Sequence, residues 1–212
     1  MHPIVFEAAI FDFDGVVVDS GPLHERAWIQ VAKERSQPIT HEIFLKGFGV
    51  KNALFIRDML KWSQDPNEIE KIIDRKEELF QSYLKTDELH IVPGVDTYVR
   101  ELKRKGILVA LGSSSIRKNI ILVLAKLQLE DLFEVIISGE NVTHGKPDPE
   151  VFLNAAKALN MAPSKCCVFE DAPLGIEAAL RAGMKVIALT TTFSKEHLST
   201  LNPDAIWDSF SS

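Results

Sequence analysis

The sequence has few cysteines and no framework for disulfide bonds. Only two of its 212 residues are cysteine, Cys166 and Cys167, and they are adjacent within an apolar run. Because neighbouring residues in a strand point to opposite faces, these two thiols are not expected to pair. Thiols that stay reduced are typical of the cytosol, so we expect a cytoplasmic protein.

Excess positive charge and long apolar runs are also lacking. Lys and Arg number 24 against 30 Asp and Glu, a formal net charge of -6, so no broad positive field is available to hold nucleic acid or anionic lipid. No run approaches the ~18 apolar residues of a membrane span, and the start MHPIVFEAAIF lacks the features of a signal peptide. We therefore expect no nucleic-acid or membrane partner, and a monomer or a small homo-oligomer.

The composition that remains is that of an ordinary globular protein, with 46% apolar and 25% charged residues. Near-continuous apolar runs predict strands that are covered on both faces, and helical patterns lie between them. Strand alternating with helix predicts an α/β fold with a doubly wound parallel sheet, and function at the carboxyl ends of its strands. The predicted strands cover residues 5–13, 107–112, 135–138, 166–169, 186–189 and 205–207.

Residues 22 to 90 interrupt that alternation. They contain no strand pattern but four amphipathic helical patterns, at residues 22–35, 40–46, 51–62 and 66–86. Asp65, Pro66 and Glu68 at the start of the last pattern predict an acid cap, a first-turn proline and a capping box. An insertion of this kind after the first strand predicts a small helical bundle over the sheet. We predict a core of residues 1–17 and 92–212 and a helical cap of residues 18–91.

The first motif with chemical content is Phe11-Asp12-Phe13-Asp14-Gly15. Asp12 and Asp14 project from the same side at the end of a buried strand. Two carboxylates so near to each other need a cation to stay ionised. A hard divalent ion with oxygen ligands meets this need, and magnesium is the usual ion where phosphate is also bound. Taken alone, the two acids could equally be turn residues beside Gly15.

Three later segments each end a predicted strand with polar residues. Ser113 and Ser114 lead into a helix, where hydroxyls and backbone N–H groups form an anion site. Lys146 precedes a proline-initiated helix and could neutralise a phosphate, and Glu170 and Asp171 could complete a metal site. Taken alone, each segment has an ordinary structural explanation: the serines would cap a helix, Lys146 would be a solvated lysine, and Glu170 and Asp171 would be turn residues. The order acid pair, serine, lysine, acid pair after four successive strands argues against chance.

With these motifs and the helical insertion between the first two, the chain resembles the haloacid dehalogenase superfamily, close to its β-phosphoglucomutase-like group of phosphatases and phosphomutases. The resemblance covers nearly the whole chain and implies a Rossmann-like core, a helical cap and a Mg²⁺ cofactor. It implies that Asp12 is the nucleophile that forms an aspartyl phosphate. It implies that Asp14 is the general acid and base, with a backbone carbonyl that also binds the metal. The implied phosphate-binding residues are Ser113, Ser114 and Lys146, and the implied metal ligands are Asp12, Asp14, Glu170 and Asp171.

Asp14 also distinguishes branches of the superfamily. The dehalogenases of the superfamily that this chain resembles lack an acid at this position, and the phosphonoacetaldehyde hydrolases carry a small residue there. An aspartate therefore favours phosphate-ester chemistry. We therefore expect magnesium-dependent hydrolysis of a small phosphorylated metabolite, with sugar phosphates as the first guess. The alternatives are a β-phosphoglucomutase-type phosphomutase, a phosphonate hydrolase and a catalytically silent binder of phosphorylated ligands.

Candidate substrate residues of the cap start with His24 and Trp28, which lie four apart on one face of the first cap helix. They match positions that in the mutases approach the acid/base and the substrate. Core packing is the alternative for both and is the preferred reading for Trp28. At the mouth of the site, Arg117 follows the serine motif and would add positive charge.

The loop around Val50 aligns with the specificity loop of the mutases, which place an arginine there to hold a second phosphate. That arginine is absent here, and Lys51 and Lys76 are the candidates to replace it. Both could also be solvated lysines on helix surfaces. Phosphonate hydrolases have an imine-forming lysine near Lys51, which is the basis of that alternative.

Overall fold

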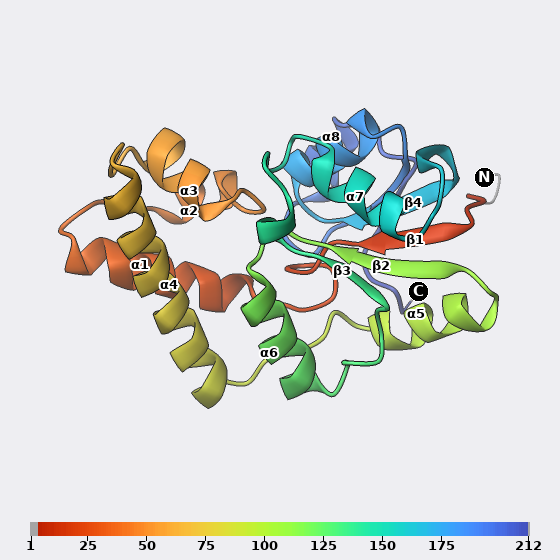
Figure 1. Cartoon of the computed structure of the whole chain (residues 1–212), viewed down its shortest axis with the longest axis horizontal. Coiled ribbons are helices and arrows are strands. Elements are labelled where there is room, and N and C mark those ends of the chain that lie inside the picture. The colour runs from red at the N-terminus through yellow and green to blue at the C-terminus, as the bar shows by residue number, and fades with distance from the viewer. Residues whose placement is uncertain (1–3, 212) are drawn as a thin grey trace.

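The structure is a computed structural model that describes residues 4–211, so residues 1–3 and 212 of the predicted core lie outside the described residues. Its centre is a six-stranded sheet in the order β3-β2-β1-β4-β5-β6, with every neighbouring pair parallel (Figure 1). The predicted doubly wound α/β fold is confirmed. The strands are β1 (Ala8–Phe11), β2 (Leu108–Gly112), β3 (Val135–Ile137), β4 (Cys166–Glu170), β5 (Lys185–Leu189) and β6 (Ala205–Trp207).

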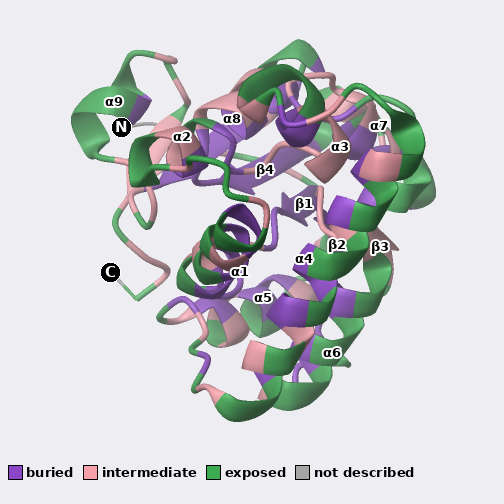
Figure 2. Cartoon of the chain, turned by 90° about the vertical axis from the view of Figure 1, so that its left-hand side faces the viewer, coloured by how far each residue is buried: buried purple, intermediate pink, exposed green. Residues whose placement is uncertain are grey.

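Helices cover both faces of this sheet. Ile10 of β1 packs in an apolar cluster with α7 and α8, while the next residue, Phe11, packs in a second cluster with α5 and α6. This two-sided burial explains why the strands read as continuous apolar runs, and Figure 2 shows β1 and β4 as buried elements at the centre of the molecule. Cys166 and Cys167 divide between the two clusters and are both free, as predicted. The covering helices are α5 (Val95–Arg104), α6 (Arg117–Leu127), α7 (Glu150–Ala158) and α8 (Pro173–Arg181), and a short α9 (Lys195–Ser199) follows β5.

Between β1 and α5 the chain forms helices that lie beside the sheet (Figure 1). No strand interrupts residues 22–90. The pattern at 51–62 predicted one helix, but the chain forms the short α3 and then a π-helix, which ends where Lys61 adopts a left-handed φ of 55°. The elements are α1 (Gly21–Glu34), α2 (His41–Lys46), α3 (Asn52–Leu54), the π-helix Phe55–Leu60 and α4 (Pro66–Thr86).

The two chain segments that join the cap to the core run side by side. Val18 and Ile91 form an isolated antiparallel bridge, and the Val92 N–H donates to the Val17 carbonyl over 3.0 Å. These contacts lie next to the predicted boundaries, which stay a prediction. No helix in the described part of the chain combines the length and the apolar character that a membrane crossing requires.

Helix α4 begins as expected except for one contact. The Asp65 carboxylate accepts from the Asn67 N–H over 3.0 Å, with Pro66 in the first turn. The expected capping box is wrong, because Glu68 instead accepts hydrogen bonds from the side chains of Ser63 at 2.6 Å and Arg35 at 2.5 Å. These partners come from the preceding loop and the end of α1, which a local pattern does not reveal.

Candidate active site

The carboxyl ends of β1, β2 and β4 meet at one edge of the sheet. Phe11 at the end of β1 pairs with Leu111 on one side and Phe169 on the other. Strand order reverses at β1, since β2 and β3 extend to one side and β4 to β6 to the other. In open α/β sheets, ligands bind at such a switch point. Asp12 directly follows β1 at this position, and Ser113 directly follows β2.

Lys146 lies between two of the predicted acids. Its Nζ is 2.7 Å from Oδ1 of Asp12 and 2.6 Å from Oε1 of Glu170, and its side chain is fully buried. Burial alone would lower the pKa of Lys146, but the charges of Asp12 and Glu170 and the hydrogen bonds to them raise it above its usual value. The ammonium group is therefore kept charged beside Asp12, the carboxylate that the family resemblance implies is the nucleophile.

Glu170 folds back on its own backbone. Its Oε2 accepts from the N–H groups of Asp171 and Ala172, both over 2.8 Å. This position is open because residue 175 is glycine: a Cβ on Gly175 would lie 1.6 Å from Oε1 of Glu170. With both oxygens engaged, Glu170 anchors Lys146 and the start of the loop that carries Asp171.

Asp171 has the opposite character. Both of its carboxylate oxygens are buried, and neither has a donor in good hydrogen-bond geometry among residues 4–211, although the Thr192 side chain is near enough to act to lower the pKa of Asp171. Burial, followed by the charges of Glu170 and Asp12, raises the pKa of Asp171 well above its usual value. Gly15 in the loop after β1 allows this close packing, since it has a φ of 86° and a Cβ there would lie 2.0 Å from Oδ2 of Asp171. A buried carboxylate of this kind needs a cation or a proton.

Three of the four predicted metal ligands lie together. Oxygen atoms of Asp12, Glu170 and Asp171 are within 4.8 Å of one another, whereas the carboxylate of Asp14 lies outside this group. Burial and the nearby Glu170 and Asp14 raise the pKa of Asp12 despite the opposing Lys146. Hard oxygen donors at a site with unsatisfied negative charge suit Mg²⁺, so the residues present fit this ion.

Asp14 is surrounded by donors instead. Its carboxylate accepts from the Ser115 hydroxyl over 2.5 Å and from the Ser20 hydroxyl, and it lies 3.1 Å from Nε2 of His24. Burial would raise the pKa of Asp14, but His24 and then the two serines outweigh burial and hold it below its usual value. Asp12 and Asp14 are thus two neighbouring acids whose pKa values are shifted in opposite directions, and Asp14 is the one held ionised in this structure.

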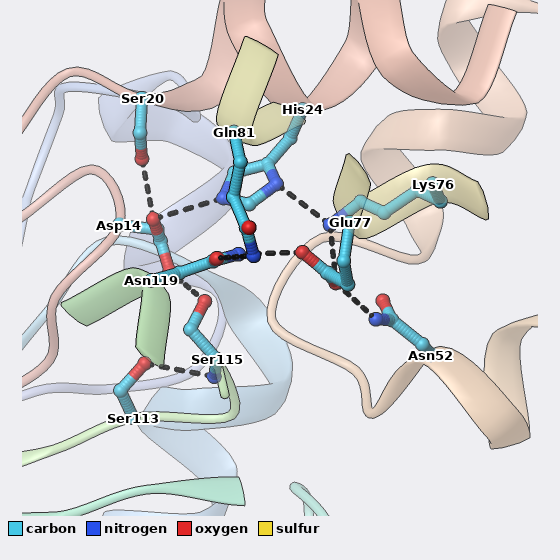
Figure 3. Close-up of polar contacts among 10 residues, drawn as sticks. All are labelled: Asp14, Ser20, His24, Asn52, Lys76, Glu77, Gln81, Ser113, Ser115 and Asn119. Carbon is cyan, nitrogen blue, oxygen red and sulfur yellow. Dashed lines mark hydrogen bonds and ion pairs between the residues drawn. The ribbon is translucent and has the colours of Figure 1, made fainter. Parts of the chain in front are cut away.

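His24 and Lys76 connect Asp14 to the cap (Figure 3). The Lys76 Nζ lies 2.9 Å from Nδ1 of His24 and 2.9 Å from Oε1 of Glu77, and the His24 ring stacks on Phe80 at 4.1 Å. Lys76 is buried. The structure therefore brings together these two predicted cap residues and excludes the reading of Lys76 as a solvated lysine.

Glu77 belongs to the same network but was missed from the sequence. It accepts from the Asn52 side chain over 2.7 Å and from the Asn119 side chain of the core helix α6 over 2.5 Å. One signal could have found it. Helix α4 buries Ile69, Ile72 and Phe80 on one face, and helical spacing places residue 77 on that face, where a charged side chain needs partners. From the sequence, Ser115 is recognised only as part of the serine motif and Asn119 only as a residue near the mouth of the site, while Ser20 and Asn52 are given no role.

A cavity lies between cap and core. Trp28 lines it, and its ring also packs edge-on against Phe55 at 5.2 Å, so it serves both as wall and as packing. The apolar lining is Trp28, Phe44, Phe48, Val50 and Phe55, and the polar side chains are Asp12, Asp14, His24, Asn52, Lys76, Glu77, Ser113, Ser114 and Ser115.

The remaining predicted residues divide between the cavity and its surroundings. Ser113 and Ser114 line the cavity, and the Ser114 hydroxyl donates to the Gly49 carbonyl of the cap over 2.6 Å. Lys51 donates from Nζ to the Val142 carbonyl at 2.8 Å, and the Arg117 guanidinium donates to a backbone carbonyl of β3 at 3.2 Å. Neither cation reaches the cavity lining, because each is engaged by a backbone carbonyl outside it. Lys76 is the one lysine that lines the cavity within residues 4–211.

Comparison with known proteins places this geometry in context. The sequence matches the family of haloacid dehalogenase-like hydrolases over residues 9–189. It is 35% identical over 190 residues to a phosphorylated carbohydrates phosphatase of Thermotoga maritima, covering 85% of this chain and 83% of the relative. It is 31% identical over 189 residues to a β-phosphoglucomutase of Bacillus subtilis, covering 86% and 83%.

A solved structure gives the same picture for the fold. The crystal structure of a β-phosphoglucomutase from Clostridium difficile matches with a TM-score of 0.86 and 29% identity, covering 97% of this chain and 92% of that one. The match extends over core and cap alike, since nearly the whole chain is covered.

Proposed function

The chain belongs to the haloacid dehalogenase-like hydrolase family and is an enzyme with phosphatases and phosphomutases as relatives. From this premise we propose that it is a magnesium-dependent phosphohydrolase that acts on a small phosphorylated metabolite, a sugar phosphate in the first instance. The observation that carries the proposal is the buried cluster of Asp12, Lys146, Glu170 and Asp171 beside Asp14. It supplies a nucleophile, charge neutralisation and a proton carrier, which are the requirements of phosphoryl transfer.

In the proposed first step, a carboxylate oxygen of Asp12 attacks phosphorus, and the bond from phosphorus to the ester oxygen breaks. For this step Asp14 has to carry a proton, although His24 and the two serines favour its ionised form in this structure; the like charge of a bound phosphate would shift it toward the protonated form. The leaving alkoxide takes that proton, which makes the product alcohol. Ser113 and Lys146 hold the phosphoryl oxygens. Asp12, Asp171 and the backbone carbonyl of Asp14 would hold Mg²⁺, which supplies positive charge to the transferring group when bound.

In the second step, Asp14 takes a proton from water while the water oxygen attacks the phosphorus of the aspartyl phosphate. Inorganic phosphate leaves, and the Asp12 carboxylate is restored. The hydrogen bonds from Ser20 and Ser115 orient the Asp14 carboxylate in both steps. The proton balance closes, because Asp14 loses one proton in the first step and gains one in the second.

Hydrolysis is favoured over mutase chemistry by the cap side of the cavity. A mutase must hold a bisphosphate in two orientations, which calls for a strong anion clamp such as an arginine. No arginine lines the cavity in the described part of the chain, and Lys76 is paired with Glu77. The phosphomutase stays the second candidate, because Lys76 still lies in the cavity next to His24.

The other two alternatives have less support. A phosphonate hydrolase would need an imine-forming lysine in the cavity, and Lys51 donates to a backbone carbonyl outside it. A silent binder would not require Asp12, Asp14 and Asp171 to be assembled as a reactive set.

The test is an incubation with β-glucose 1-phosphate and a trace of the bisphosphate, with inorganic phosphate and glucose 6-phosphate followed in parallel. Phosphate release is expected to outpace isomerisation. Isomerisation that is much faster than phosphate release would make the phosphomutase correct. Turnover of p-nitrophenyl phosphate, measured alongside, separates an enzyme from a silent binder.

A further inference from the structure

The cavity contains a buried carboxylate that the proposed hydrolysis does not use. Glu77 of α4 is 7% exposed and lines the cavity on its cap side. Its two oxygens accept hydrogen bonds from three side chains on three different helices (Figure 3). These donors are Lys76 of α4 at 2.9 Å, Asn52 of α3 at 2.7 Å and Asn119 of α6 at 2.5 Å.

Glu77 determines the charge of the cap side of the cavity. Burial would raise its pKa, but the charges of Lys76 and His24, with hydrogen bonds from Lys76 and Asn119, hold the pKa of Glu77 below its usual value. The carboxylate is therefore ionised at neutral pH. It cancels the charge of Lys76, the one lysine that lines the cavity among the described residues, so the pair of Lys76 and Glu77 offers no net positive charge to an anion.

The rest of the cap side suits a carbon skeleton with hydroxyl groups. The rings of Trp28, Phe44, Phe48 and Phe55 form an apolar wall that can face the C–H side of a sugar or polyol. An ionised carboxylate accepts hydrogen bonds and donates none. A hydroxyl directed at Glu77 is thus stabilised, whereas a phosphate there would meet a like charge.

From these contacts we propose that Glu77 determines specificity: it selects phosphate monoesters whose far end carries hydroxyl groups and rejects substrates that carry a second phosphate. The inference rests on the proposed phosphatase function and names its substrate class. The hydrogen bond to Asn119 holds the Glu77 carboxylate in place from the core side. Glu77 acts on substrate choice, while Asp12 and Asp14 carry out the reaction.

The experiment compares wild type with Glu77→Gln on two substrates that differ by one phosphate, β-glucose 1-phosphate and β-glucose 1,6-bisphosphate. The readout is kcat/KM for phosphate release from each. The amide keeps the shape of the side chain but removes its charge, which also leaves the ammonium of Lys76 free to attract the second phosphate. We expect the ratio of bisphosphate to monophosphate kcat/KM to rise by about tenfold or more, mainly through KM.

Glu78→Gln is the matched control. Glu78 is the next residue of α4, has a side chain that is 68% exposed and pairs with Arg75 across 3.2 Å. Its loss removes the same charge from the same helix but not from the cavity. The substrate ratio of this variant is expected to equal that of wild type. Because both substrates are measured on one preparation, a fraction of unfolded protein cancels in the ratio.

The other outcomes contradict the proposal. Equal losses on both substrates, which leave the ratio unchanged, would show that Glu77 only links cap to core, and a lower ratio would also overturn the proposal. A wild type that already prefers the bisphosphate would also overturn it. If wild type releases phosphate from neither sugar nor from p-nitrophenyl phosphate, the proposed function itself fails, and the inference fails with it.

Discussion

On the core side of the site, three of the proposed functional groups directly follow strands of one sheet, whereas on the cap side the groups project from helices and are joined by side-chain hydrogen bonds. Asp12, Ser113 and Asp171 are each the first residue after a strand. His24, Lys76 and Glu77 come from α1 and α4 and are linked by hydrogen bonds. The backbone ladder of the sheet positions the first set, and side-chain contacts alone position the second.

The two halves also differ in charge. The core cluster has excess negative charge and leaves both oxygens of Asp171 without a donor in good hydrogen-bond geometry in the described residues. The cap pair of Lys76 and Glu77 is internally balanced. This difference fits the proposed function: the core, which needs a cation, would carry out the reaction, and the cap, whose Lys76–Glu77 pair is balanced, would select the substrate.

Loss of the nucleophile should have the largest effect. Asp12→Asn is expected to lower kcat by at least about a thousandfold, because an amide cannot form the aspartyl phosphate. The fold should persist, since the amide oxygen can still accept from Lys146 and one member of a like-charge cluster is removed. Phosphate release and circular dichroism check both parts. Asp19→Asn, at an exposed position of the same motif, is the control. Activity of Asp12→Asn within tenfold of wild type would contradict the assignment of Asp12 as the nucleophile.

Removal of divalent metal should come next. Excess chelator is expected to abolish activity, and added Mg²⁺ to restore it, because the carboxylates would otherwise repel the phosphate and one another. Mg²⁺ should also raise the melting temperature of wild type, but much less that of Asp171→Asn, since binding to the folded state alone is stabilising. Full activity in excess chelator would show that the acid cluster is not a metal site.

Loss of the proton carrier should have a smaller effect. Asp14→Ala is expected to lower kcat by about a hundredfold or more, through slower formation and slower breakdown of the aspartyl phosphate. Rapid-quench measurement of both steps and a pH–rate profile provide the check. A variant that keeps the wild-type pH–rate profile would mean that another group carries the proton.

The cap should respond more mildly, and only where a side chain lines the cavity. Lys76→Ala is expected to raise KM by about tenfold while kcat changes less, because it removes a buried cation and leaves Glu77 with one donor fewer. Lys51→Ala should leave kcat/KM within about twofold, since Lys51 contacts Val142 outside the cavity. If Lys76→Ala and Lys51→Ala changed KM equally, the position of Lys76 in the cavity lining would not explain its effect.

The smallest effect concerns the stability of the cap. Hydrogen bonds from Arg75 and Gln30 lower the pKa of Glu34 to about 2, so this ionised group contributes stability that is present above about pH 4.5 and is lost as the pH falls toward about 2. The ion pair of Glu34 and Arg75 is exposed, so its contribution to the free energy of unfolding is small. Glu34→Gln should lower the melting temperature by roughly 2 °C at neutral pH. The difference should disappear in acid, and a difference that persists there would mean that packing causes it.

Much of this molecule could be predicted from local patterns. The apolar runs locate all six strands, because strands buried on both faces must be apolar along their whole length. The order of Asp12, Ser113, Lys146 and Glu170 then predicts one site, since the carboxyl ends of parallel strands meet at the same edge. Helix α4 was predicted over residues 66–86 and is found there, because its acid cap and proline lie at its own start.

What only the tertiary structure decided are the partners of side chains on separate elements. Nothing near Glu77 in the sequence indicates Asn119, 42 positions away, which donates to it, and the periodicity of α4 predicts burial without naming a partner. Lys51 and Lys76 look alike in the sequence, yet one reaches a backbone carbonyl outside the cavity and the other lies inside it. Strand ends are positioned by backbone hydrogen bonds that every residue can make. Helix side chains are positioned by packing against another helix, so their contacts depend on crossing geometry that no local pattern records.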